Sequence, residues 1–411
     1  MTVPRSIPGV RALRGYRASW LRHDLVAGIV LTTLLVPQGM AYAELAGLPV
    51  ITGLYTTILC LLGYALLGPS RLLVLGPDSS LGPMIAAALL PIVGSDGDPA
   101  RAIALASMLA LMVGAVMIVA GVAKLGFVAD LLSKPTQIGY MNGLALTILV
   151  GQLPKLFGFK VDADGLIPEA RGFVDGLADG GTVTAAVAMG LVSLALILLL
   201  GRWLPKIPGV LIAVVVAIAS ASAFNLAEHG VSLVGTLPKG FPPLTFPSPV
   251  SDLPLLAAAA FGIALVALTD TISTASAFAA RTGQEVNGNG EMIGIGTANV
   301  AAGFFQGFPV STSGSRTAVA EQAGAKTQLT GVVGAAAIVV MLLVVPGLLK
   351  NLPQPTLAAV VTKVERRRCG DRPDHRDQHA GDARQPSPEH HDQREADGPD
   401  RDGGADRLAR R

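Results

Sequence analysis

The chain has 411 residues, of which 51% are hydrophobic and 15% charged, and its formal net charge is +2. This composition is typical of a membrane protein, and it gives no indication of a nucleic-acid partner because the basic residues sit at the ends of loops. The two cysteines, Cys60 and Cys369, provide no disulfide framework. The N-terminus also lacks the pattern of a cleavable signal peptide.

Apolar runs of about 20 residues, the length that crosses a bilayer, follow one another through most of the chain. They predict twelve membrane spans, of which the third and tenth are short half-spans. The predicted spans are 24–46, 50–67, 77–93, 102–121, 136–155, 181–201, 207–224, 253–280, 290–306, 314–323, 327–346 and 354–364.

The distribution of charge over the loops predicts a cytoplasmic N-terminus, because basic residues favour the cytoplasmic side. Five arginines precede the first span: Arg5, Arg11, Arg14, Arg17 and Arg22. Alternation from there places the later basic loop residues inside, namely Arg71, Lys124, Lys134, Arg202, Lys206, Arg281 and Lys326. It places the acidic loop residues outside, namely Asp96, Asp98, Asp162, Asp164, Glu169, Asp175 and Asp179.

The first span carries polar residues in the stretch VPQGMAYAELAGLP. Pro37 removes a helix hydrogen bond and frees backbone groups for a ligand or water. Gln38 and Tyr42 are four residues apart, so they share one helix face. Glu44 lies near the outer end of the span. A carboxylate in a membrane span predicts a proton or cation relay, and the alternative is an interfacial side chain solvated at the mouth.

Two segments interrupt the apolar pattern with Gly, Pro and hydroxyl residues, and they lie far apart in the chain. They read LGPSRLLVLGPDSSLGP over residues 67–83 and GFFQGFPVSTSGSR over residues 303–316. A pair of broken spans in corresponding halves of a membrane protein predicts a transport site, since irregular backbone at membrane depth must be buried or wetted. Helix starts there favour an anion. The alternative is two unrelated loops.

The eighth predicted span contains a carboxylate near its middle. Asp270 is surrounded by hydroxyl residues and shares a face with Thr274, four residues later. Carboxylate and hydroxyl oxygens together predict a sodium site or a titratable proton site. The alternative is a buried Asp that is only hydrogen-bonded to its neighbours.

Charged residues also stand at the two predicted half-helix starts. Ser313, Gly314 and Ser315 lead into Arg316, whose guanidinium would add a full positive charge to the helix dipole. The alternative for Arg316 is that its side chain reaches out to the cytoplasmic edge. At the other start, Asp78 precedes Ser79 and Ser80. Asp78 has three open roles: capping its own helix, pairing with Arg316, or carrying a proton.

Four stretches taken together resemble the SulP family of sulfate-permease-like anion transporters. They are LVPQGMAYAELAGLPVITGLYT, GPSRLLVLGPDSS, TDTISTASAFAARTG and FFQGFPVSTSGSRTAVAEQAGAKTQLTG. The resemblance covers roughly residues 20–362. It implies an all-α polytopic membrane protein with two inverted seven-span repeats, arranged as a core of spans one to four and eight to eleven and a gate of the remaining spans. It also implies a homodimer.

The resemblance further implies roles for individual positions. Substrate-binding positions of the family match Gln38, Tyr42, Asp78, Ser79, Ser80, Ser313, Gly314, Ser315 and Arg316. Glu44 matches a carboxylate linked to proton coupling, and Asp270 with Thr274 matches the sodium site of the bicarbonate branch. The Asp at position 78 departs from the apolar residue that animal members carry there.

The chain departs from the family after the twelfth span. The family continues with two more spans and usually a cytoplasmic sulfate-transporter/anti-sigma-factor (STAS) domain, whereas here the apolar pattern stops near Val364. We therefore expect a basic cytoplasmic N-terminus at 1–23, a transmembrane domain at 24–364 that lacks its last two spans, and a disordered charged tail at 365–411 without a STAS domain. The Arg, Asp, Pro, Gly and His bias of the tail suggests a gene read out of frame after about residue 362.

Together these features predict secondary active transport of an inorganic anion, sulfate first, with proton or sodium coupling and no other cofactor. The protein would lie in the bacterial inner membrane. Bicarbonate or a C4-dicarboxylate is the alternative substrate, an inactive truncated product is an alternative outcome, and a nucleobase permease of the same fold is disfavoured by Arg316. No enzyme signature appears, because Ser and His do not converge and no phosphate-binding loop is present.

Overall fold

Each of the twelve predicted spans contains a helix in the computed structural model. The structure describes residues 8–94, 97–126, 134–161, 163, 165–204, 208–246, 253–282 and 286–370. The span helices are α2 (Leu21–Leu45), α3 (Val50–Leu67), α4 (Gly82–Val93), α5 (Pro99–Val122), α6 (Lys134–Phe157), α8 (Thr184–Trp203), α9 (Gly209–Ala223), α10 (Leu253–Thr282), α11 (Gly288–Phe304), α12 (Gly314–Gln322), α13 (Leu329–Val344) and α14 (Gln354–Gly370).

Two further helices lie outside the predicted spans, namely α1 (Pro8–Arg14) and α7 (Leu166–Ala178). The segment of α7 contains apolar residues at helical spacing, but it is too short to span a bilayer and was expected only as an acidic outer loop. The ring of Phe173 in α7 packs edge-on against Phe157, with 5.1 Å between centroids, and stacks on Phe159. This aromatic cluster holds α7 against the end of α6.

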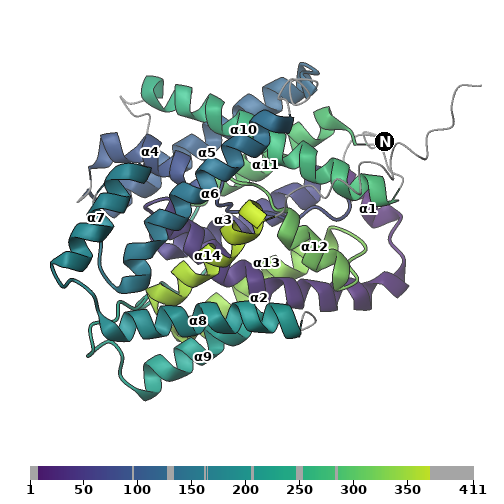
Figure 1. Cartoon of the computed structure of the whole chain (residues 1–411). Coiled ribbons are helices and arrows are strands. Elements are labelled where there is room, and N and C mark those ends of the chain that lie inside the picture. The colour runs from purple at the N-terminus through teal and green to yellow at the C-terminus, as the bar shows by residue number, and fades with distance from the viewer. Residues whose placement is uncertain are drawn as a thin grey trace, which may run out of the picture. The chain divides into compact units, whose positions relative to one another are not determined.

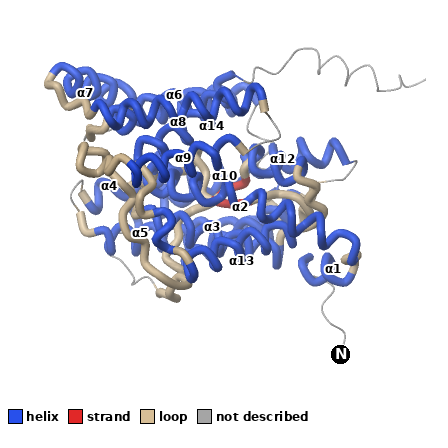
Figure 2. The backbone as a smooth tube through the Cα atoms, turned by 90° about the horizontal axis from the view of Figure 1, so that it is seen from below, coloured by secondary structure: helices blue, strands red, loops and turns tan. Residues whose placement is uncertain are grey.

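The helices fall into two groups by the contacts they make. Helix α14 packs along α6 and α8, and α8 packs on α9, so we call these four helices the gate group (Figure 1). Helices α2 to α5 and α10 to α13 form the core group, in which α11 packs on α5 and α3, and α13 packs on α2. Figure 2 shows the only strands of the described residues as a short red segment between α2, α10 and α12.

Small residues bring the core helices unusually close together. A Cβ atom on Gly53 of α3 would lie 1.9 Å from the carbonyl oxygen of Gly39 in α2, so no side chain fits there. Likewise, a Cβ atom on Gly114 of α5 would lie 2.7 Å from the carbonyl oxygen of Gly296 in α11. Close backbone approach through glycines is the usual way in which membrane helices gain packing energy.

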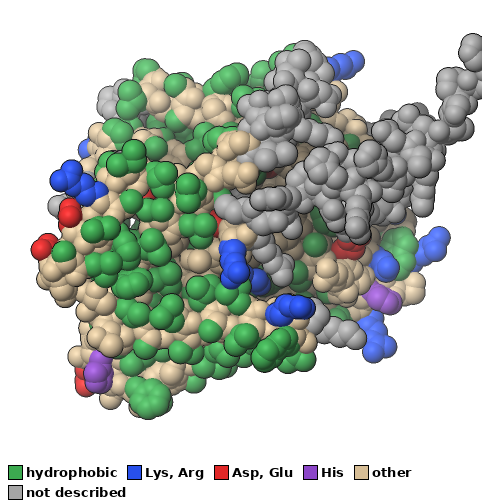
Figure 3. Space-filling model, in the orientation of Figure 1, with side chains coloured by type: hydrophobic (Ala, Val, Ile, Leu, Met, Phe, Trp, Pro, Cys, Tyr) green, Lys and Arg blue, Asp and Glu red, His purple; other side chains and the backbone are tan. Residues whose placement is uncertain are grey.

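The outer surface is apolar where a bilayer would contact it. Large hydrophobic side chains are exposed along α8 and α9, including Leu191, Leu199 and Val215. Figure 3 shows hydrophobic side chains spread over the described part of the visible face, with basic side chains near its middle and further basic, acidic and histidine side chains at its margins. Among the described residues, five helices are long and apolar enough to cross a membrane: α2, α3, α5, α8 and α10. The protein is therefore a multi-pass membrane protein.

A buried carboxylate fixes the beginning of α2 to the turn between α12 and α13. Asp24 is fully buried, and its Oδ1 accepts hydrogen bonds from the backbone N–H groups of Lys326 (2.7 Å) and Thr327 (3.1 Å). The hydroxyl groups of Thr327, Thr330 and Tyr16 donate to the same carboxylate. Because all of these donors except Tyr16 come from a segment about 300 residues away, Asp24 joins the two ends of the core group.

The C-terminal region is described only as far as Gly370, where α14 ends. The expected tail at 365–411 therefore lies outside the described residues beyond position 370, and its first six positions belong to α14. Several residues of the predicted loops also lie outside the described residues, namely Arg5, Asp96, Asp162, Asp164 and Lys206.

Candidate functional site

The two broken segments meet as an antiparallel pair of short strands. Strand β1 (Leu75–Gly76) pairs with β2 (Ser311–Thr312), with Leu75 opposite Thr312 and Gly76 opposite Ser311. The backbone N–H of Ser313 also donates to the carbonyl oxygen of Val74, at 3.1 Å. The segments are thus parts of one structure rather than two separate loops, as their similar composition predicts.

A short helix starts close behind each strand. Helix α12 begins at Gly314, directly after β2, and α4 begins at Gly82, after the turn that contains Asp78, Ser79 and Ser80. The first N–H groups of a helix have no partner within the helix and carry partial positive charge. The paired strands therefore place two such helix starts at one location inside the core group.

Two side-chain amides form hydrogen bonds with the backbone of the broken segments, and the sequence analysis predicted neither. Asn299 of α11 donates to the carbonyl oxygen of Val310 (3.2 Å) and accepts from its backbone N–H (2.9 Å). Gln328 donates to the carbonyl oxygens of Ser70 and Leu73, both at 2.9 Å. An amide matches an irregular backbone because it offers a donor and an acceptor. Nothing local in the sequence marks these two residues among other polar residues.

Arg316 is the third residue of α12 and is fully buried. Its Nη1 donates to the carbonyl oxygen of Pro77 at 2.7 Å, so the guanidinium reaches across to the first broken segment. Its Nε and Nη2 are buried without a hydrogen-bond partner among the described residues. The alternative that Arg316 extends to the cytoplasmic edge is therefore wrong. A buried cation with two open donors is chemically suited to receive an anion.

Asp78 and Asp270 approach the same hydroxyl group. Ser80 Oγ lies 2.7 Å from Asp78 Oδ2 and 2.8 Å from Asp270 Oδ2. The backbone N–H of Ser80 also donates to Asp78 Oδ2, at 3.1 Å, so Asp78 forms an Asx turn ahead of α4, whose N-cap residue is Leu81. The middle of α10 is thereby linked to the start of α4. Asp78 and Ser80 are buried, and Asp270 is partly buried.

The remaining hydroxyl residues line the same region. Thr312 of β2 donates to Thr271 of α10 at 3.1 Å, and a Cβ atom on Gly314 would lie 3.9 Å from Thr274 Oγ1. Ser313 Oγ lies 3.1 Å from Ser315 Oγ. Ser79 Oγ is buried with no hydrogen-bond partner in the described part of the chain. Helix α10 therefore presents its polar face to both broken segments.

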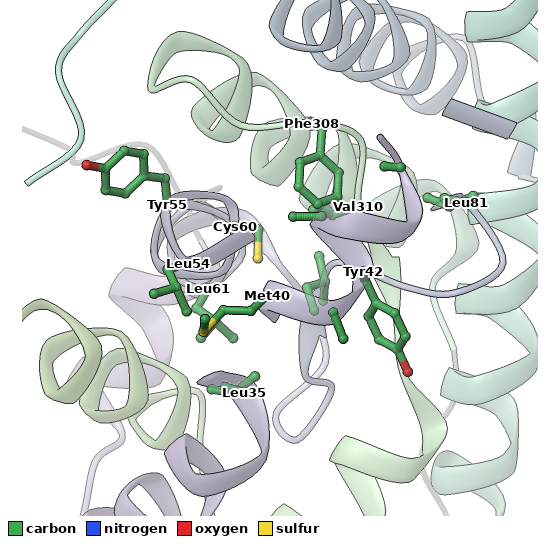
Figure 4. Packing of buried hydrophobic residues seen from close by; sticks show 14 of the residues in the cluster. Leu35, Met40, Tyr42, Leu54, Tyr55, Cys60, Leu61, Leu81, Phe308 and Val310 are labelled. Carbon is green, nitrogen blue, oxygen red and sulfur yellow. The ribbon is translucent and has the colours of Figure 1, made fainter. Parts of the chain in front are cut away.

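The first-span residues Gln38 and Tyr42 are both buried, with 4% and 2% of their surfaces exposed. Both lie on α2, which packs against α4 and α12 among other helices. Figure 4 shows the Tyr42 hydroxyl pointing away from the apolar cluster that contains Met40 and Cys60. The structure thus brings the α2 residues and the two broken segments into one region of the core group.

Glu44 is placed differently from the other predicted residues. Its Oε1 lies 3.2 Å from Nζ of Lys155 on α6, so its partner belongs to the gate group. Its side chain is 18% exposed. Sequence reasoning did not single out Lys155, because it looked like one more basic residue at a span end.

Among the described residues, no group of three or more His, Cys, Asp and Glu side chains gathers as a metal site. Asp270 and Thr274 lie one helical turn apart on α10. They remain the candidate residues for a sodium ion because both carry oxygen atoms.

A cavity of about 300 Å³ lies beside the segment that directly precedes β1. Its walls include Ser70, Arg71, Leu73, Lys326 and Glu291. Glu291 is fully buried and accepts hydrogen bonds from Tyr64 (2.6 Å) and Ser70. Arg71 and Lys326 bring positive charge to this cavity, which is a suitable approach for an anion.

The model of the sulfate permease family matches residues 21–368 of the chain. A probable sulfate transporter of Mycobacterium tuberculosis is 42% identical over 362 residues, which cover 88% of this chain and 64% of that protein. The human protein prestin is 32% identical over 382 residues, with 86% of this chain and 51% of that protein covered. The chain thus spans less than two thirds of the length of these relatives.

Solved structures of transporters have the same arrangement of helices. The murine Solute Carrier 26 family member A9 anion transporter, in the inward-facing state, matches with a TM-score of 0.83 and 26% identity, covering 91% of this chain and 65% of that chain. The transmembrane domain of the cyanobacterial bicarbonate transporter BicA matches with a TM-score of 0.78 and 22% identity, covering 86% and 90%. The second likeness concerns the fold alone.

Proposed function

Since this chain belongs to the sulfate permease family, we propose that it carries out secondary active transport of an inorganic anion, with sulfate as the leading substrate. The observation that carries this proposal is the buried Arg316, whose Nε and Nη2 have no hydrogen-bond partner in the described structure. Two helix starts lie beside this cation. A bound anion would satisfy the open donors and the helix ends together.

Sulfate fits this set of donors because a tetrahedral dianion accepts hydrogen bonds in several directions at once. The two open guanidinium nitrogens, the Ser79 hydroxyl and the helix starts supply such directions. Bicarbonate and C4-dicarboxylates use the same donors and are the alternative substrates. A neutral nucleobase gains less from a buried guanidinium, which disfavours the nucleobase permease.

We propose a proton as the coupling ion, because the Ser80 hydroxyl has too few hydrogens to donate to both carboxylates beside it. A serine hydroxyl has one hydrogen, yet Ser80 Oγ is at hydrogen-bonding distance from the carboxylates of both Asp78 and Asp270. Both contacts are hydrogen bonds only if one carboxyl group is protonated and donates to Ser80. With both carboxylates ionised, the two negative charges also outnumber Arg316. One proton would balance the local charge and favour anion entry.

The charges and the cavity support an inward-facing conformation with a cytoplasmic N-terminus. The cavity with Arg71 and Lys326 lies near the N-terminal end of α2, because the Lys326 N–H binds Asp24 there. Both cations are on the side where basic loop residues are expected. The proposed location is the bacterial inner membrane, and a homodimer is the proposed assembly.

Uptake of labelled sulfate into vesicles that contain the purified chain tests the proposal. We expect saturable uptake driven by an inward proton gradient, reduced in competition by sulfate and much less by uracil. Strong competition by bicarbonate or succinate would move the substrate assignment to those anions. No uptake above that of protein-free vesicles, despite correct insertion, would favour the inactive product.

Single neutralised carboxylates test the coupling ion. Asp270→Asn and Asp78→Asn should each flatten the pH dependence of uptake, because either change removes the shared proton. Sodium dependence that disappears in Asp270→Asn and Thr274→Val would instead assign sodium coupling. If only Glu44→Gln flattened the pH dependence, the proton would belong to Glu44 and the Ser80 assignment would be wrong.

A further inference from the structure

One ion pair in the described structure connects the core group with the gate group. Glu44 Oε1 of α2 and Lys155 Nζ of α6 are 3.2 Å apart, and the two side chains are 18% and 29% exposed. Helix α2 belongs to the core group and α6 to the gate group. The pair therefore crosses the boundary between the two parts that alternating access would move against each other.

Each partner is fixed within its own group. Glu44 lies between Ala43 and Ala46, which are buried in the main apolar core. Lys155 directly precedes Leu156, which packs with Ala358 and Ala359 in a small apolar cluster separate from that core. Neither backbone can follow the other group without disturbing buried packing. A sliding movement of the two groups would therefore have to break the ion pair.

The ion pair and the cavity lie towards opposite ends of α2. Asp24, near the start of α2, binds the backbone of Lys326, which lines the cavity. Glu44 is twenty positions further along the same helix, about 30 Å away at the helical rise per residue. Tyr42 lies on α2 just before Glu44. The cavity thus lies towards the Asp24 end of α2, and the ion pair lies towards the other end of the same helix.

We propose that Glu44 and Lys155 form a latch that holds the outer side of the transporter closed while the cavity side is open. The inference rests on the proposed alternating access, and it gives both residues a role other than binding the anion. Glu44 acts as the ionised partner of Lys155. Breaking the pair removes an attraction that exists only in the closed arrangement, so the population of the outward-open state rises.

Cysteine labelling measures this population without requiring transport. Gln152 is 3% exposed and lies one turn before Lys155 on α6, so a Gln152→Cys reporter should become accessible only when the outer side opens. The background is the full chain with Cys60→Ala and Cys369→Ser. A membrane-impermeant maleimide is added outside intact cells. We expect Glu44→Gln and Lys155→Gln each to accelerate labelling up to about fivefold, the upper range for a partly exposed pair.

A charge swap and a matched control separate a latch from general loosening. The double variant Glu44→Lys with Lys155→Glu should return labelling to the parent rate. Asp175→Asn removes the partner of Arg171 at 3.9 Å within α7, and it should leave labelling unchanged.

Unchanged labelling in both single variants would overturn the latch. So would accelerated labelling that the charge swap fails to reverse, or the same acceleration in Asp175→Asn. These outcomes are independent of sulfate uptake, so failure of the latch and failure of the transport proposal are distinguishable.

Discussion

The guanidinium of Arg316 lies directly against the backbone of Gly76. A Cβ atom on Gly76 would lie 2.8 Å from Nη1 and 3.1 Å from Cζ of Arg316, and the carbonyl oxygen of Pro77 accepts a hydrogen bond from Nη1. The pairing of β1 with β2 creates this arrangement, because it sets Gly76 opposite Ser311, just before α12. A missing side chain in one broken segment thus makes room for the cation of the other.

Removal of the cation is expected to remove anion binding. Arg316→Ala should weaken sulfate binding by about a hundredfold or more, because it deletes the charge and all donors of the guanidinium. Arg316→Lys should be less harmful, since a point charge remains without the planar fork. Calorimetric titration of the purified variants measures both effects. Arg202→Ala is the control, because Arg202 is exposed at the end of α8; unchanged affinity in Arg316→Ala would refute the site.

Filling the space at Gly76 should displace Arg316. Gly76→Ala is expected to lower sulfate affinity by about tenfold and to reduce stability by about 1–3 kcal/mol, the usual cost of overpacking a buried site. Gly201→Ala is the matched control, since a Cβ atom at Gly201 of α8 meets nothing within 4 Å. Sulfate binding and thermal unfolding in detergent are the measurements. Equal behaviour of the two variants would contradict the close approach of Arg316 and Gly76.

Ser79 should show opposite effects on stability and on binding. Its hydroxyl is buried without a partner in the described structure, so Ser79→Ala is expected to raise the free energy of unfolding by about 1 kcal/mol in the absence of anion. If the hydroxyl donates to a bound anion, the same change should weaken sulfate binding about tenfold. Thermal unfolding with and without sulfate compares the two effects. A variant that is less stable without anion would show that Ser79 has a structural partner.

Asp24 is expected to be a stability residue without a direct role at the site. Asp24→Asn keeps one acceptor oxygen for the N–H groups of Lys326 and Thr327 but puts a donating NH2 group where Oδ2 accepts from the hydroxyls of Thr327 and Tyr16, and with the lost charge it should cost about 3 kcal/mol. Asp98→Asn is the comparison with little expected effect, because Asp98 caps α5 at an exposed position by accepting from Ala100, and Asn caps a helix about as well as Asp. The shift of the unfolding midpoint in detergent measures both. Equal shifts would mean that the Asp24 contacts contribute little.

Several features of the fold follow from the sequence because they depend on local properties. The thickness of a bilayer sets the length of the apolar runs, so the spans could be placed to within a few residues, as for α3 at Val50–Leu67. The Gly, Pro and hydroxyl residues of the broken segments predicted that the two segments belong together, and β1 and β2 pair. Arg316 stood out because a charge within apolar surroundings is costly. Helix α7 was missed because it is amphipathic and shorter than a membrane span.

The contacts that give these residues their roles were decided only by the tertiary structure. Ser80 and Asp270 are 190 positions apart, and Arg316 and Pro77 are 239 apart. Periodicity reports which face of a helix a residue occupies, but it contains no information on which distant helix that face will meet. The partnership of Glu44 with Lys155 and the support from Asn299 and Gln328 depend on such meetings. The sequence by itself determined a membrane protein of the sulfate permease family with two broken spans and a cation at one of them. Packing between distant helices decided that this cation is buried and which side chains surround it.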